Sequence, residues 1–124
     1  MNMEEMIDKY FRPGRLPHIW CPGCGNGIVT GCIVKAVAKL DLAKDNVAVI
    51  SGIGCSSRAS GYLDFNTVHS AHGRALPVAT GVKLADPNLT VLVVTGDGDA
   101  TAIGGNHLIH AARRNIDMTV VLYN

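Results

Sequence analysis

The segment from Val91 to Ala100 constrains the fold of this chain more than any other stretch. Residues 91–95 read Val-Leu-Val-Val-Thr, an apolar, β-branched run that predicts a buried strand. Gly-Asp-Gly-Asp follows at 96–99, and glycine lets a backbone turn tightly and approach a ligand closely. An apolar helical pattern comes next, and a helix N-terminus favours an anion. The segment therefore predicts a site for a diphosphate and a divalent cation such as Mg²⁺, although the aspartates could instead cap the following helix.

Strand and helix patterns alternate along the rest of the chain. Further strands are predicted at 47–50 and 118–123, and helices at 27–40, 75–84 and about 102–114. Residues 1–20 form a polar arm expected to be loop or extended, and 56–72 are expected to be loop with one helical turn. Continuous apolar strands between helices are typical of an α/β fold with a parallel sheet and helices on both faces.

Composition narrows the classes of function. The 124 residues allow one domain, with 48% hydrophobic and 17% charged residues and a net charge of +1. A net charge this small does not indicate binding to nucleic acid or to an anionic membrane. No apolar run approaches the roughly 20 residues of a membrane span. The N-terminal segment lacks the order of a signal peptide, so we expect a reducing, cytoplasmic location. Four cysteines there are expected to be ligands or core residues rather than disulfides.

The cysteines form a second signal. Cys21 and Cys24 frame a Cys-Pro-Gly-Cys turn that could hold iron or zinc, act as a redox dithiol, or be structural. Cys55 follows a predicted strand within Gly-Ile-Gly-Cys-Ser, at the functional edge of a sheet, and this favours a ligand role. Cys32 lies on the apolar stripe of helix 27–40 and is expected in the core. One alternative remains: a small zinc- or iron-binding structural module that uses all four cysteines.

Of the five histidines, His72 is the best candidate for an active-site residue. It stands at a predicted helix start within His72-Gly-Arg-Ala75, where donors could meet a phosphate or carboxylate. We expect it to have an active-site role. No pair of histidines shows the acid-flanked i, i+4 pattern of a helical metal site.

Taken together, these motifs resemble the beta subunits of 2-oxoacid:ferredoxin oxidoreductases, most closely the 2-oxoglutarate or broad 2-oxoacid type. The resemblance rests on the segments at 20–26 (WCPGCGN), 51–56 (SGIGCS), 72–75 (HGRA), 96–99 (GDGD), 103–107 (IGGNH) and 111–115 (AARRN). It implies an enzyme subunit that uses thiamine diphosphate, Mg²⁺ and a 4Fe–4S cluster. Such an enzyme decarboxylates a 2-oxoacid oxidatively, forms an acyl-CoA from coenzyme A, and passes electrons through the cluster to ferredoxin. Its alpha subunit supplies the activating glutamate, and the only glutamates of this chain are Glu4 and Glu5.

The resemblance also implies roles for individual residues. Cys21, Cys24 and Cys55 would ligate the cluster, and Asp97 would ligate Mg²⁺. The residues implied to line thiamine diphosphate are Ile53, Gly54, Cys55, Ser56, Gly98 and Asp99.

The resemblance further implies a thiamine-diphosphate-binding fold that is incomplete at its C-terminus. Residues 21–124 would be a partial thiamine-diphosphate and magnesium domain carrying the cluster cysteines, preceded by the arm 1–20. The fourth cluster cysteine and the second Mg²⁺ ligand are expected beyond Asn124, which would lie beside the metal site.

Overall fold

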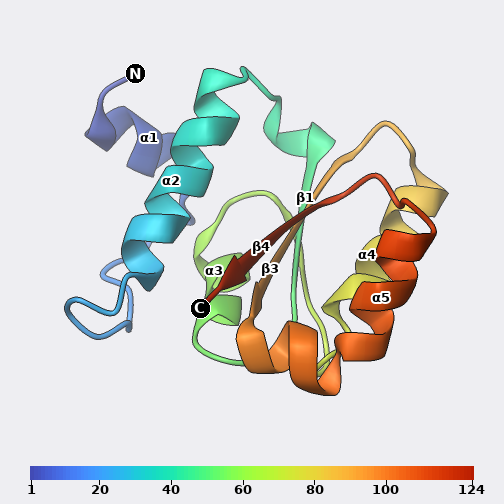
Figure 1. Cartoon of the computed structure of the whole chain (residues 1–124). Helices are drawn as coiled ribbons and strands as arrows, with labels where there is room; N and C mark the ends of the chain where they lie inside the picture. Colours follow the sequence, from blue (N-terminus) through green and yellow to red (C-terminus); the bar gives the residue numbers. More distant parts are fainter.

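The computed structural model describes residues 1–124 and contains one parallel sheet of order β2-β1-β3-β4 (Figure 1). The strands are β1 (Val47–Ser51), β2 (Asn66–His69), β3 (Thr90–Gly96) and β4 (Thr119–Tyr123). Every neighbouring pair is parallel. The predicted strands at 47–50, 90–95 and 118–123 are confirmed to within one residue at each end.

Helices cover both faces of the sheet, as predicted (Figure 1). The helices are α1 (Met3–Tyr10), α2 (Asn26–Lys39), α3 (Ala59–Tyr62), α4 (Ala75–Ala85) and α5 (Gly105–Arg113). Short turns of 3₁₀ helix, η1 (Lys44–Asn46) and η2 (Ser56–Arg58), and a π-helical turn, η3 (Gly98–Ile103), complete the chain. The α1, α2 and α3 helices share one hydrophobic cluster, and α4 and α5 contribute to the other.

The central strand β1 shows why two separate cores form. Its five residues are all buried. Val47 and Val49 belong to the cluster under α2 and α3, whereas Ala48 and Ile50 belong to the cluster under α4. Successive side chains of a strand point to opposite faces, so a strand covered on both sides must be apolar at every position.

The prediction that residues 1–20 lack helix is wrong, because α1 occupies Met3–Tyr10. The Asn2 side chain accepts a hydrogen bond from the Glu5 N–H at 2.9 Å, and the Asn2 N–H donates to the Glu5 carboxylate at 2.7 Å. This capping box satisfies two donors at the helix start. The helix contacts α2 and buries Tyr10, so the N-terminal segment is part of the packed structure.

The prediction for residues 56–72 is incomplete, because it omits strand β2. This strand lies at the edge of the sheet and pairs only with β1, and most of its residues are exposed. Its sequence, Asn-Thr-Val-His, therefore carries no apolar run for a pattern search to find. The last predicted helix also begins later than expected, at Gly105, because the π-helical turn η3 precedes it.

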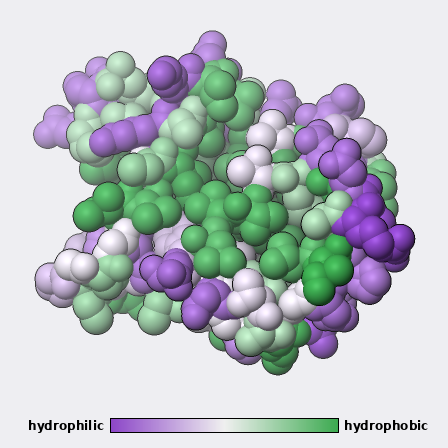
Figure 2. All heavy atoms as spheres, in the orientation of Figure 1, coloured by the Kyte–Doolittle hydropathy of each residue, from purple (hydrophilic) through white to green (hydrophobic).

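Strand β4 forms the opposite edge of the sheet and pairs only with β3. Figure 2 shows hydrophobic residues gathered across the middle of this face, over α2 and β4, with polar residues towards the rim. Ile28 and Leu122 are among the exposed apolar side chains. None of the helices combines the length and apolar character that crossing a membrane requires.

Candidate active site

Most of the candidate site lies beyond the carboxyl ends of the parallel strands, and Asn26 at the start of α2 completes it. A cavity of about 260 Å³ opens where the loops beyond these strand ends meet. Its lining residues are Asn26, Ile53, Gly54, Cys55, Ser56, His72, Gly96, Asp97, Gly98, Asp99, Tyr123 and Asn124. The glycine-rich loops after β1 and β3 thus form one crevice.

The position of the cavity follows from the topology. The chain leaves β1 towards β2 on one side and leaves β3 towards β4 on the other, while β1 and β3 pair with each other. The two loops therefore separate at a topological switch point, where open α/β sheets bind their ligands. Every residue predicted to contact thiamine diphosphate, together with Asp97 and His72, lines this cavity.

Asp97 presents a free carboxylate to the cavity. Its side chain is exposed and caps no helix, although its carbonyl accepts a hydrogen bond from the Thr101 hydroxyl at 2.6 Å. Asn124 lines the same cavity and adds an amide oxygen. Carboxylate and amide oxygens are donors that Mg²⁺ accepts, so the residues present fit a hard cation in their chemistry.

Asp99 differs sharply from Asp97, because its carboxylate is buried and fully engaged. One oxygen, Oδ1, accepts from the Gly73 N–H at 2.7 Å and the Ile53 N–H at 3.2 Å, and lies 2.7 Å from His72 Nδ1. The other, Oδ2, accepts from the Thr95 hydroxyl at 2.7 Å. Burial alone would raise the pKa of Asp99, but these hydrogen bonds outweigh it and hold the pKa below its ordinary value of 3.8.

Gly52 explains how the Asp99 carboxylate reaches the loop after β1. A Cβ atom at position 52 would overlap both carboxylate oxygens of Asp99. Only glycine therefore allows the backbone of this loop to lie against Asp99, so that the loops after β1 and β3 are held together by one side chain.

The remaining predicted cofactor residues lie on the surface of the cavity. Ile53, Gly54, Cys55 and Gly98 are exposed, whereas Ser56 is buried at the start of η2. Such a lining of backbone and small groups leaves room for a ligand with phosphate groups to approach the loops closely.

The four cysteines are all exposed and free. The prediction that Cys32 lies in the core is wrong: α2 buries Thr30, Ile33, Val34 and Val37, and Cys32 falls outside this stripe. No group of three or more His, Cys, Asp or Glu side chains is gathered in a geometry that could hold a metal ion. Cys21, Cys24 and Cys55 offer thiol donors of the kind an iron–sulfur cluster needs, but this structure does not assemble them around a centre.

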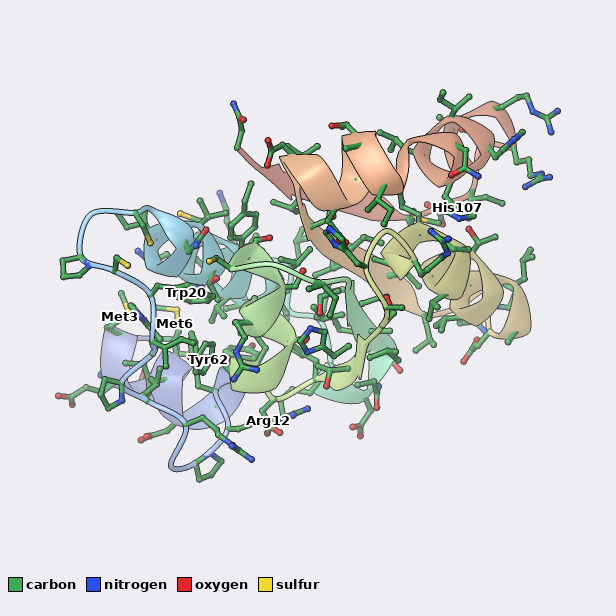
Figure 3. All side chains as sticks on the ribbon, turned by 90° about the horizontal axis from the view of Figure 1, so that it is seen from below. Met3, Met6, Arg12, Trp20, Tyr62 and His107 are labelled. Atoms are coloured by element: carbon green, nitrogen blue, oxygen red, sulfur yellow. The ribbon has the colours of Figure 1, made fainter.

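Trp20 nevertheless links the two cysteine segments. Its indole Nε1–H donates to the Cys55 carbonyl at 2.6 Å. Its ring packs edge-on against Tyr62, with centroids 5.1 Å apart (Figure 3). The centroid of the His18 ring lies 5.0 Å from that of Trp20. The residue directly before Cys21 is thus tied to the loop that carries Cys55.

Asn26 and Tyr123 are among the cavity residues that were not predicted as site residues. Asn26 is the first residue of α2 and follows the Cys-Pro-Gly-Cys-Gly segment directly. Tyr123 ends β4, and its buried hydroxyl lies 3.1 Å from the Thr30 hydroxyl on α2. Their positions at the start of a helix and the end of a strand were the available signals.

A larger cavity of about 350 Å³ lies between α1, α2 and residues 16–20. Met3, Met6, Ile28 and Val34 are among its apolar lining residues, and Cys32 lies there too. It lacks the carboxylates and glycine-rich loops of the smaller cavity, which is therefore the candidate active site.

Comparison with known proteins agrees with this choice. Residues 52–124 match the family described as "Thiamine pyrophosphate enzyme, C-terminal TPP binding domain". The chain therefore belongs to the thiamine pyrophosphate enzymes. The matched region begins at Gly52 and includes both glycine-rich loops of the cavity.

Within this class, the relatives confirm the resemblance to beta subunits of 2-oxoacid:ferredoxin oxidoreductases. The 2-oxoglutarate synthase subunits KorB of Archaeoglobus fulgidus and Methanothermobacter thermautotrophicus are 60% and 58% identical, over 98% and 94% of this chain. A solved 2-oxoglutarate:ferredoxin oxidoreductase from Magnetococcus marinus, with 2-oxoglutarate, coenzyme A and succinyl-CoA bound, superimposes with a TM-score of 0.88 at 45% identity, over 94% of this chain. The chain spans 45% and 41% of the two KorB sequences and 39% of the solved chain.

Proposed function

We propose that this chain forms the diphosphate- and Mg²⁺-binding part of a 2-oxoacid:ferredoxin oxidoreductase beta subunit. The whole enzyme would convert 2-oxoglutarate and coenzyme A into an acyl-CoA and pass the electrons through a 4Fe–4S cluster to ferredoxin. An alpha subunit would complete the active site. The observation that carries the proposal is the polar cavity at the β1–β3 switch point, with the free Asp97 carboxylate at its edge.

The names of the relatives support the choice of reaction. Five KorB relatives are called 2-oxoglutarate synthase or oxidoreductase subunits. A relative from Aeropyrum pernix, 50% identical, is called a 2-oxoacid:ferredoxin oxidoreductase beta subunit. The small number of glutamates is consistent with a glutamate supplied by another subunit, since Glu4 and Glu5 lie on α1 and not in the cavity.

Each part of the cavity has a task in this proposal. Bound thiamine diphosphate supplies a centre that stabilises a carbanion, and the protein binds and orients it. Asp97 would hold Mg²⁺ against the diphosphate, and the loop residues Ile53 to Ser56 and Gly98 would surround the cofactor. Cys21, Cys24 and Cys55 would supply three thiolate ligands of the cluster.

The alternative, a closed structural metal site made by four cysteines, is not favoured. Cys55 lines the polar cavity, whereas Cys32 lines the separate apolar cavity by α1 and α2. The relatives named above are 2-oxoglutarate synthase and 2-oxoacid:ferredoxin oxidoreductase subunits.

The proposal is tested in the full-length beta subunit assembled with its alpha subunit under anaerobic conditions. We expect 2-oxoglutarate- and CoA-dependent reduction of ferredoxin with formation of succinyl-CoA. Asp97→Ala should weaken Mg²⁺-dependent binding of thiamine diphosphate about tenfold or more, because a hard ligand is lost, while the iron content stays unchanged.

Asp45→Ala is the matched control, since Asp45 is an exposed aspartate on η1, before the amino end of β1. It should bind the cofactor like the wild type. Normal cofactor affinity in Asp97→Ala, measured by titration calorimetry, would refute the role proposed for this carboxylate.

A further inference from the structure

We infer that Asp99 is a positioning residue that orients His72: its carboxylate binds Nδ1 of the imidazole and leaves Nε2 for hydrogen bonding to a bound cofactor or substrate. This inference rests on the proposed function of the same cavity and goes beyond it. It gives Asp99 a task other than direct contact with the cofactor.

The direction of the hydrogen bond follows from the other partners of Asp99. The Ile53 and Gly73 N–H groups can only donate, and both donate to the Oδ1 atom that His72 contacts. The Thr95 hydroxyl donates to Oδ2. The carboxylate therefore acts as an acceptor towards all these groups, and His72 Nδ1 is the donor. Because Nδ1 is used by Asp99, Nε2 is the ring nitrogen left for a bound group.

Asp99 is rigid enough to impose this orientation. Its side chain is only 2% exposed, and the close approach of Gly52 leaves the carboxylate no space in which to turn. A Cβ atom at Gly104 would overlap the Asp99 carbonyl, so the backbone at Asp99 is equally confined.

The imidazole ring of His72, in contrast, is half exposed, so its orientation depends on a hydrogen-bond partner. Its side chain is 47% exposed and lines the polar cavity, and Asp99 is the hydrogen-bond partner of its ring. The backbone beside it is held by the Gly73 N–H, which donates to Asp99 Oδ1 at 2.7 Å, and the φ of +70° at this position suits glycine. A confined carboxylate thus holds an exposed ring at the edge of the cavity.

The first experiment maps what Nε2 contacts. The full-length complex is treated with diethyl pyrocarbonate, which acylates an unprotonated imidazole nitrogen, and acylation of His72 is measured by mass spectrometry. We expect His72 to react in the cofactor-free complex and to be protected by a ligand. Protection by thiamine diphosphate with Mg²⁺ alone assigns the contact to the cofactor. Protection that requires 2-oxoglutarate or coenzyme A assigns it to that substrate. Equal reaction under all conditions overturns the inference.

The second experiment is a double-mutant cycle of Asp99→Asn and His72→Gln in the active complex. If Asp99 acts through His72, each single variant should lower kcat/KM by about tenfold or more, and Asp99→Asn should add less than about threefold in the His72→Gln background. Effects that simply multiply would show that Asp99 acts independently of His72 and would overturn the inference.

One control variant and one independent measurement keep this cycle interpretable. Asp117→Asn removes an exposed carboxylate that pairs with Lys83 at 3.0 Å, away from the cavity, and should leave kcat/KM unchanged. If Asp99→Asn fails to assemble, the acylation of His72 in the wild-type complex still decides the question. A wild-type complex without 2-oxoacid-dependent activity would count against the proposed function itself, and the protection experiment would still test the orientation of His72.

Discussion

The indole nitrogen of Trp20 donates a hydrogen bond of 2.6 Å to the carbonyl oxygen of Cys55, across 35 positions of sequence. Because Trp20 directly precedes Cys21, this bond sets the distance between the Cys-Pro-Gly-Cys turn and the loop after β1. Trp20 is 8% exposed and rests on Tyr62 of α3 (Figure 3). The link is therefore anchored in the core rather than at the surface.

Trp20→Phe is predicted to weaken this link while keeping most of the aromatic packing. Loss of one hydrogen bond should lower the free energy of unfolding by about 1 kcal/mol, and more if the Cys55 carbonyl is left without a partner. In the full-length complex we also expect a lower iron content per beta subunit. Both quantities are measured by denaturant unfolding and by iron analysis.

Tyr62→Phe is the control for Trp20→Phe. It removes the hydrogen bond from the Ile19 N–H to the Tyr62 hydroxyl, 2.9 Å long, and keeps the ring against Trp20. It should lower stability by a similar amount and leave the iron content unchanged. Full iron content in Trp20→Phe would argue against a role for Trp20 in placing Cys55.

The cysteine variants separate the two interpretations of the thiols. Cys21→Ser, Cys24→Ser and Cys55→Ser should each remove the iron–sulfur absorbance of the anaerobically purified complex. Cys32→Ser should keep it and change stability by less than about 0.5 kcal/mol, because Cys32 is exposed. If Cys32→Ser lost iron to the same extent as Cys55→Ser, a four-cysteine site within this chain would replace the proposed ligand set.

Most of the fold could be predicted from the sequence, because apolar runs leave a strong signal in the central strands β1 and β3 and also in the edge strand β4, where only Tyr123 is buried. The runs at 47–50, 90–95 and 118–123 are apolar on both faces, and all three became strands. Strand β2 could not be predicted in this way, since an exposed edge strand is held by backbone pairing and needs no apolar pattern. The spacing of Asn2 and Glu5, which form a capping box, was the available signal for α1. The polar character of the segment led instead to the prediction of loop or extended chain.

The candidate site was predicted as a set of loops but not as a network. The two glycine-rich loops could be placed together because neighbouring parallel strands end at the same edge. The sequence does not reveal that Asp97 and Asp99, two positions apart, face opposite environments. That difference arises from the π-helical turn η3, which leaves Asp97 exposed and buries Asp99 against Gly73 and Thr95.

Gly52→Ala is predicted to disturb the site through packing alone. The added methyl group would overlap the Asp99 carboxylate, which cannot move aside without losing its hydrogen bonds. Overpacking of this kind should cost about 1–3 kcal/mol of stability and weaken binding of thiamine diphosphate. Thermal unfolding and cofactor titration of the full-length protein measure the two effects.

Gly81→Ala is the matched substitution for Gly52→Ala. Gly81 lies within α4, and a Cβ there meets no atom within 4 Å. Alanine should stabilise this helix by about 0.5–1 kcal/mol, because it loses less conformational freedom than glycine on folding. Equal effects of the two substitutions would contradict the close contact between Gly52 and Asp99.

Ionisation of the Tyr123 phenol is predicted to lower the stability of the folded chain at alkaline pH. Burial raises the pKa of the Tyr123 phenol above its ordinary value of 10.0, and the charge of Cys32 adds to this, whereas the hydrogen bond with Thr30 opposes it. A raised pKa in the folded state means that the contribution of Tyr123 to stability is complete below pH 10.0. As the pH rises above 10.0, the unfolded chain ionises first, so this contribution is progressively lost.

Tyr123→Phe should remove this part of the alkaline slope and, at neutral pH, cost about 1 kcal/mol, since the buried Thr30 hydroxyl loses its partner. Denaturant unfolding of both proteins at neutral pH and above pH 10.0 measures the difference, and identical alkaline slopes would show that the Tyr123 hydroxyl ionises as readily in the folded chain as in the unfolded one.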